Sequence, residues 1–274
     1  MPRRTKFSRH VANCATVQSL TATHTVCDPG RNGWILAASV TALATLMGCA
    51  PADQEMESED AVRTDVTLGS DPTIFGGARD DDQPSGVVAL KVGRQGSYEL
   101  CSGALVAPNV VLTARHCVAR SITTTVSCDE NGDSTNGSHV DGNQEPSTVS
   151  VYLGATPKFS QQADAVGASI VSPKSDHLCD SDIALVVLDR PITSAAPMSV
   201  RMAGGVAPGE TIRSIGYGQN DRRIPIGTRF RKPNVAILAM GKGVSESQTA
   251  LGPHEFEVGR SICQGDSGGP AISE

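Results

Sequence analysis

A single serine lies among glycines near the end of this 274-residue sequence, in the run GDSGGP at residues 265–270. Glycines allow a tight backbone turn, and such a turn can aim amide N–H groups at a reacting carbonyl. A serine hydroxyl is a weak nucleophile at neutral pH, so Ser267 needs a neighbouring base and a group that orients this base. The chemistry to look for is therefore nucleophilic attack on a carbonyl carbon.

Two further segments offer the base and the orienting carboxylate. His116 lies in the run LTARHC at residues 112–117, and Asp182 begins the run DIAL at residues 182–185. Each segment alone has a plain structural reading, because a lone histidine is more often a satisfied core residue and an aspartate before an apolar strand is usually a strand-end charge. Together, in the order His, Asp, Ser, they indicate catalysis by an activated serine.

These three segments resemble, in order and spacing, the trypsin/chymotrypsin family of serine proteases. The resemblance implies that Ser267 attacks a peptide carbonyl, that His116 takes and returns the proton, and that Asp182 orients the imidazole. It also implies an oxyanion hole formed by the backbone amides of Gly265 and Ser267. A protein or peptide would be the substrate, cleaved through an acyl-enzyme without a cofactor.

One position bears on substrate choice. Ser261 lies six residues before the nucleophile, at the position that lines the base of the primary specificity pocket in the family. Trypsin-like enzymes have an aspartate there to pair with Lys or Arg. The uncharged Ser261 therefore predicts a neutral or apolar side chain at the P1 position of the substrate.

The run IFGG at residues 74–77 resembles the mature N-terminus of the family. Cleavage after Thr73 by an activating protease would free the α-ammonium of Ile74 to pair with Asp266, and a buried ion pair of this kind is an effective switch. The alternative is that the segment merely enters the first strand. Arg115 replaces the small residue that usually precedes the histidine, and the sequence leaves open whether it perturbs the site or points outward.

Cysteine use after residue 100 is typical of an oxidising compartment. The resemblance pairs Cys101 with Cys117, sixteen residues later, around the histidine loop. Cys128 lies in a polar loop after the histidine, and Cys179 lies three residues before Asp182. A bridge between Cys128 and Cys179 would join two loops on either side of the catalytic residues.

The sequence gives only weak support to two possible metal sites. The first would combine cysteine and histidine side chains that lack the close ligand spacing of known metal motifs, namely Cys101, His116, Cys117 and Cys179. The second would use the acidic residues of the polar stretch 127–146, whose spacing misses the EF-hand template. We therefore expect no metal, and we expect residues 127–146 to be a surface insertion without strands.

Residues 34–48 form a continuous apolar run that is short for a membrane span and is typical of the hydrophobic part of a signal sequence. The run LMGC at residues 46–49 resembles a bacterial lipobox, in which cleavage after the glycine leaves Cys49 to be acylated. An Ala/Leu-rich signal with a chance cysteine is the alternative. We expect residues 1–49 to be a signal region and the mature protein to be exported, either as a membrane-anchored lipoprotein or as a secreted protein. Ala50 in place of an aspartate favours the outer membrane.

Residues 50–73 carry seven acidic side chains and one basic side chain. Their few apolar residues cannot repay the entropy cost of ordering, so we expect an acidic linker or propeptide. The whole chain has a formal net charge of −6, which gives no basic face for nucleic acid.

Residues 74–274 are expected to form the protease domain. They contain short strand patterns separated by Gly, Pro, Asn and Asp turns and no long helical periodicity, which predicts an all-β fold. Strands are expected at 87–92, 102–106, 110–113, 148–153, 168–171, 183–188, 211–216 and 235–238. The resemblance implies two antiparallel six-stranded barrels with His116 and Asp182 in the first, Ser267 in the second and the active site between them.

The family continues after its serine with two more strands, a substrate-binding segment and a partner for Cys263. This sequence ends at Glu274, so we expect a truncated domain with an incomplete second barrel and an unpaired Cys263. Two functions remain open at this stage. The catalytic residues favour an active serine endopeptidase, and the truncation favours a catalytically inactive homologue that acts as a binding or scaffold protein.

Overall fold

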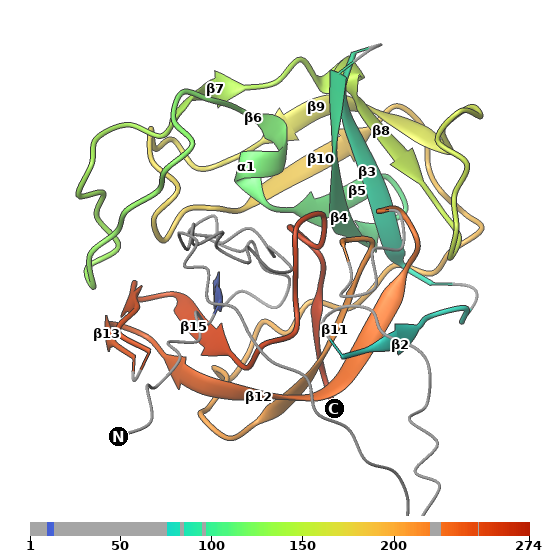
Figure 1. Ribbon diagram of the computed structural model, residues 1–274. Coiled ribbons are helices and arrows are strands. Elements are labelled where there is room, and N and C mark those ends of the chain that lie inside the picture. The colour runs from blue at the N-terminus through green and yellow to red at the C-terminus, as the bar shows by residue number, and fades with distance from the viewer. Residues whose placement is uncertain (1–9, 14–75, 83–84, 95–96, 220–225, 246) are drawn as a thin grey trace, which may run out of the picture. The chain divides into compact units, whose positions relative to one another are not determined.

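The structure is a computed structural model that describes residues 10–13, 76–82, 85–94, 97–219, 226–245 and 247–274 (Figure 1). All of these residues belong to one compact unit. Outside them lie Cys49, the linker 50–73, Ile74 and all of the expected signal region except residues 10–13.

The first half of the domain is a closed antiparallel barrel of six strands, in the order β10-β5-β4-β3-β8-β9. The strands are β3 (Val87–Arg94), β4 (Ser97–Ala107), β5 (Val110–Thr113), β8 (Val149–Tyr152), β9 (Ala165–Val171) and β10 (Ala184–Leu188). Alternate side chains of β10 are buried, as a strand with one face toward a core requires. Closure leaves no free strand edge, so the barrel is a rigid support for the loops at its rim.

The second half is a six-stranded sheet built on β12. Its strands are β1 (His10–Asn13), β2 (Ala78–Arg79), β11 (Thr211–Gly216), β12 (Phe230–Met240), β15 (Glu255–Val258) and β16 (Ala271–Ser273). The path runs β1-β15-β12-β11-β16, with β2 paired to β12. This sheet is not closed within the described residues, so one of the two expected barrels is present and the other is an open sheet.

Each half has its own apolar core. The barrel core includes Leu90, Leu105 and Val186, and the core of the sheet includes Ile237 and Phe256. A third cluster joins the halves, because side chains of β3 and β8 pack against residues in and just after β11. Its members are Val87, Ala89, Tyr152, Ile215 and Tyr217.

Short elements complete the fold. The helix α1 (Arg115–Val118) leads into β6 (Ala119–Ser121), which pairs with β7 (Val140–Asn143), and a 3-10 turn, η1 (Pro146–Thr148), follows. The strand β7 corrects the expectation that residues 127–146 contain no strand. A small ribbon of β13 (Gly243–Val244) and β14 (Ala250–Leu251) precedes β15. No helix in the described part of the chain is long and apolar enough to cross a membrane.

Candidate active site

His116 and Asp182 are in direct contact. His116 is the second residue of α1, and Asp182 lies two residues before β10. One carboxylate oxygen of Asp182 accepts a hydrogen bond from the backbone amide of His116 at 2.7 Å, and the other lies 2.7 Å from the imidazole Nδ1. The carboxylate thus fixes both the backbone and the ring of the histidine, and it leaves Nε2 as the ring nitrogen that faces other partners.

Burial separates the roles of the two side chains. The side chain of Asp182 is 0% exposed, whereas that of His116 is 27% exposed. Burial opposes the charged imidazolium, but the nearby charge of Asp182 and its hydrogen bond outweigh this effect and raise the pKa of His116. Glu99 adds a smaller contribution in the same direction. The pair is arranged to stabilise a proton on the imidazole.

Ser267 is held next to the histidine helix by its own backbone. Its carbonyl oxygen accepts a hydrogen bond from the amide of Ser102 in β4 at 2.8 Å and lies 3.8 Å from the Sγ of Cys117. Because Cys117 directly follows His116, this contact brings the serine backbone beside the histidine. Ser267 is only partly buried, so part of the residue is exposed to solvent.

The turn around Ser267 depends on glycine. Gly265 has φ +95° and Gly268 has φ +78°, a region that L residues with side chains rarely adopt. A Cβ atom at Gly268 would lie 2.1 Å from the hydroxyl of Thr113 and 2.5 Å from the carbonyl oxygen of Ser102. The turn therefore packs against the barrel at a distance that no larger residue permits.

The two amides expected to form the oxyanion hole are available as donors. The amides of Asp266 and Gly269 are used in the turn itself, where they donate to the carbonyls of Cys263 and Asp266. The amides of Gly265 and Ser267 have no acceptor among the described residues. A reacting carbonyl oxygen would find these two donors unoccupied.

Asp266 is a buried carboxylate, 2% exposed. Its oxygens accept hydrogen bonds from the amides of Gly218 at 2.7 Å and Cys263 at 2.9 Å. Burial raises the pKa of Asp266 to about 7, and the two amide hydrogen bonds oppose this rise. Its expected partner Ile74 lies outside the described residues.

Ser261 is fully buried, and its Oγ lies 3.4 Å from the Oγ of Ser214 in β11. The position therefore holds a small neutral hydroxyl that is already in contact with another hydroxyl.

Arg115 is the residue whose place the sequence left open. It is 3% exposed, so the outward orientation is wrong. Its guanidinium donates hydrogen bonds to the backbone carbonyls of Ser175 and His177, in the segment that leads to Asp182. No sequence signal could have found these partners, because a backbone carbonyl is present at every position.

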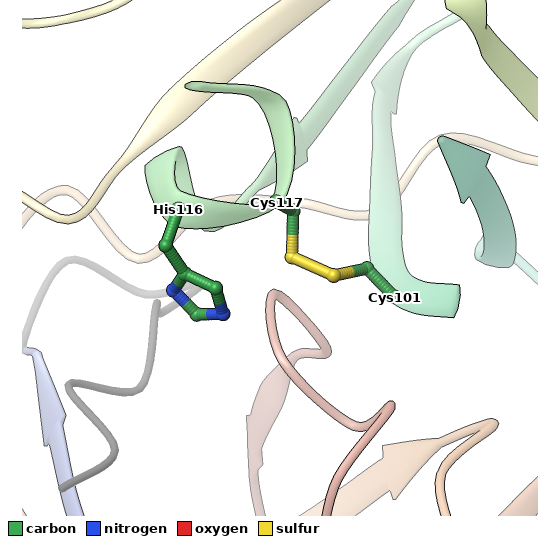
Figure 2. A group of neighbouring side chains, drawn as sticks. All are labelled: Cys101, His116 and Cys117. Carbon is green, nitrogen blue, oxygen red and sulfur yellow. A yellow bond between two sulfur atoms is a disulfide. The ribbon is translucent and has the colours of Figure 1, made fainter. Parts of the chain in front are cut away.

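Disulfide bonds surround the site. Cys101 in β4 is joined to Cys117 in α1, and Figure 2 shows the His116 ring extending from the helix beside this bridge. Cys128 is joined to Cys179. Cys263 is disulfide-bonded as well, so the expectation that it is unpaired is wrong.

The cysteines and the histidine in Figure 2 could be mistaken for a metal site. Ligand atoms of Cys101, His116 and Cys117 lie within 4.8 Å of one another. Both sulfur atoms belong to the disulfide, however, and a thiolate is the form of cysteine that binds metals. The group therefore offers a metal only the imidazole.

The sequence matches the protein family described as Trypsin over residues 74–274. Chymotrypsin-like elastase family member 3A of Homo sapiens is 27% identical over 197 residues, which cover 67% of this chain and 66% of that protein. The trypsin of Saccharopolyspora erythraea is 25% identical over 186 residues, which cover 64% of this chain and 70% of that protein. The chain thus spans just under two thirds of the elastase relative.

Solved structures share the fold. The scabies mite inactivated protease paralogue S-D1 has a TM-score of 0.51 at 16% identity, covering 73% of this chain and 81% of that one. The paralogue S-I1 has a TM-score of 0.50 at 19% identity, covering 72% and 82%. The shared fold agrees with the family match. Because this match runs from residue 74 to residue 274, the chain belongs to the trypsin family of serine proteases.

Proposed function

We propose that this protein is a serine endopeptidase in which Ser267 is the nucleophile, His116 the general base and Asp182 the orienting carboxylate. The observation that carries the proposal is the buried Asp182 carboxylate, held 2.7 Å from both the amide and the Nδ1 of His116. Asp182 would fix the tautomer that leaves Nε2 able to take the serine proton, and it would stabilise the imidazolium that results.

The remaining steps follow the established chemistry of such a triad. The Ser267 oxygen bonds to the peptide carbonyl carbon as its proton passes to His116, and the imidazolium then protonates the leaving amine. The amides of Gly265 and Ser267 would stabilise the oxyanion, and each such donor contributes about 2.7–4 kcal/mol to transition-state stabilisation in comparable enzymes. Water attacks the acyl-enzyme in the second half of the reaction and releases the second product.

Substrate choice and activation are further parts of the proposal. The small neutral Ser261 at the base of the pocket supports a neutral or apolar P1 side chain. Cleavage after Thr73 would supply the Ile74 ammonium as a partner for Asp266, whose carboxylate is buried with amide donors only among the described residues. An activating protease is therefore a proposed partner, in addition to the protein or peptide substrate.

The location of the protein follows partly from its disulfides. A disulfide-bonded domain of this family indicates an extracellular setting. We further propose that residues 1–49 are an export signal ending in an acylated Cys49, that residues 50–73 are a linker or propeptide, and that residues 74–274 are the protease domain. The apolar run 34–48 and the acidic stretch that follows it support this order.

Reaction with a fluorophosphonate probe tests the enzymatic proposal, because such probes bond to an activated serine. We expect the purified chain, with Ile74 exposed by limited proteolysis, to be labelled covalently and Ser267→Ala to remain unlabelled. Peptide mapping of the labelled chain should place the adduct on residues 265–270. Labelling that persists in Ser267→Ala would contradict the assignment of the nucleophile.

A catalytically inactive homologue that binds other proteins is the second candidate. The open second sheet favours it, because an incomplete sheet supports the substrate cleft less well. A folded wild-type chain that stays unlabelled before and after exposure of Ile74 would establish this alternative.

A further inference from the structure

A buried arginine connects the two elements that carry His116 and Asp182. Arg115 immediately precedes the histidine in α1, and its Nη1 donates to the carbonyl of His177 at 3.2 Å. Its Nη2 donates to the carbonyl of Ser175. Both acceptors lie in the segment 175–182, which ends at the proposed orienting carboxylate. The Nε of Arg115 has no partner among the described residues, so the two terminal nitrogens make these contacts.

The segment 175–182 accepts hydrogen bonds from Arg115 and also from backbone amides at the start of β7. The carbonyl of Asp176 accepts hydrogen bonds from the amides of His139 at 2.7 Å and Val140 at 3.0 Å. The carbonyls of Ser175 and His177 thus face the guanidinium, while that of Asp176 faces the amides at the start of β7. The forked shape of a guanidinium suits two acceptors at this spacing, and a lysine ammonium lacks that shape.

Two carboxylates lie near the buried arginine and partly offset the cost of burying its charge. Burial lowers the pKa of Arg115, and the carboxylates of Asp182 and Asp176 oppose this effect. A guanidinium keeps its proton in proteins even when it is buried. A fixed cation therefore lies near Asp182 without forming an ion pair with the oxygens that hold His116.

We infer that Arg115 is a positioning residue, which sets the distance between α1 and the segment 175–182 and so keeps the Asp182 carboxylate in contact with His116. The inference rests on the proposed function. Arg115 does not touch the reacting atoms, so its contribution is to orientation. Misplacement of a catalytic group by about 1 Å can slow a reaction about 100-fold.

The first test measures the titration of the His116 ring by NMR in a Ser267→Ala background, which excludes self-digestion and needs no activity. We expect Arg115→Lys, which keeps the positive charge but lacks the forked shape, to lower the His116 midpoint by about half a pH unit, because a displaced Asp182 stabilises the imidazolium less. Arg115→Ala also removes a cation near Asp182, which by itself raises the midpoint, so the charge-conserving variant carries this test. Arg120→Ala is the matched control, since Arg120 is an exposed arginine that donates to the carbonyl of Asn143 in the neighbouring strand. It should leave the midpoint unchanged.

The second test measures the rate of fluorophosphonate labelling in the chain that keeps Ser267. Arg115→Ala should reduce the rate about tenfold to 100-fold, while Arg120→Ala should not. An Arg115→Lys protein that melts as a folded protein, with a wild-type titration and a wild-type labelling rate, would overturn the inference. If Arg115→Ala does not fold, Arg115→Lys decides the question, and a wild-type midpoint in that variant would reduce Arg115 to a purely structural role. A wild-type chain that is not labelled would refute the enzymatic proposal alone, because the NMR titration still tests the positioning.

Discussion

At the scale of single residues, the site depends on how the fold restricts the solvent contacts and hydrogen-bond partners of each side chain. Asp182 is shielded from water, so its charge acts strongly on His116. His116 keeps one ring nitrogen for other partners, and Ser267 keeps a partly open side chain on a turn that only glycine can form. These restrictions suit the three residues to the proposed roles of nucleophile, base and orienting group.

The pH dependence of labelling should report the state of His116. The base must be neutral to accept the serine proton, and Asp182 raises the pKa of His116 above its ordinary value of 6.5. We therefore expect the labelling rate to rise with pH through a midpoint above 6.5. Asp182→Asn removes the charge and should lower both the midpoint and the limiting rate, the latter by about 10⁴-fold as in the comparable triad. A midpoint that Asp182→Asn leaves in place would show that another group controls the reaction.

The residue types of the proposed triad could be predicted from the sequence, because the runs GDSGGP, TARHC and DIAL contain the serine, the histidine and the aspartate themselves. The positioning contact of Arg115 could not be predicted. Its acceptors are carbonyls of Ser175 and His177, and their direction is fixed by the pairing of Asp176 with β7, which lies far away in sequence. Contacts to backbone groups of a distant segment leave no trace in the side-chain pattern.

At the scale of elements, the loops at the rim of the barrel are joined covalently. The Cys128–Cys179 disulfide ties the insertion after β6 to the segment that carries Asp182. Cys179 is fully buried there, while Cys128 is only partly buried and half of the residues in the insertion 127–146 are exposed. The bridge therefore anchors a solvated loop to a buried segment, and its 51-residue separation restricts the unfolded chain.

Removal of this bridge should cost stability. The double variant Cys128→Ser/Cys179→Ser should lose about 2–4 kcal/mol of unfolding free energy, chiefly because the unfolded chain regains the freedom of a large loop. Urea unfolding without added oxidant or reductant measures the difference in unfolding free energy. Mass spectrometry should confirm that the Cys101–Cys117 bridge remains. An unchanged unfolding midpoint would show that the Cys128–Cys179 bridge does not stabilise the fold.

Strand prediction succeeded in short apolar runs and failed where charged side chains are buried. The barrel strands near 87–92, 110–113 and 183–188 lie where the pattern places them. The strand β15 was missed because Glu255 and Glu257 occupy buried positions, where Glu255 accepts hydrogen bonds from the amides of Asp180 and Gly252. The long β12 was predicted only over residues 235–238, since Asn234 with φ +55° interrupts the strand. Hydrogen bonds to buried carboxylates and a left-handed residue within a strand are features that the sequence pattern does not show.

At the scale of the whole domain, a buried carboxylate connects stability to pH. Asp266 has a pKa of about 7 in the folded state and an ordinary value of 3.8. Between these values the folded chain binds more protons than the unfolded chain, so stability must fall as pH rises. The stabilising difference is complete below pH 3.8 and is lost as pH passes about 7.

Asp266→Asn should remove this dependence. In the unprocessed chain, the melting temperature of the variant relative to wild type should rise steadily from pH 4 to pH 8, because only the wild-type chain must bury a new charge. Thermal melts at several pH values measure the difference. Melting curves of the two chains that stay parallel across this range would show that Asp266 is not protonated in the fold. Glu255, whose pKa is also raised by burial, keeps its effect in both chains and so cancels.

The hydroxyl of Ser102 has a consequence for how the domain assembles. It donates to the carbonyl of Gly265 at 2.9 Å and accepts from the amide of Tyr217 at 2.9 Å, while the Ser102 amide holds the carbonyl of Ser267. Polar groups from two later loops therefore find their partners only on a finished β4. The turn that carries Ser267 thus takes its shape only against a folded barrel. We expect the proposed nucleophile to become reactive only once β4 has folded.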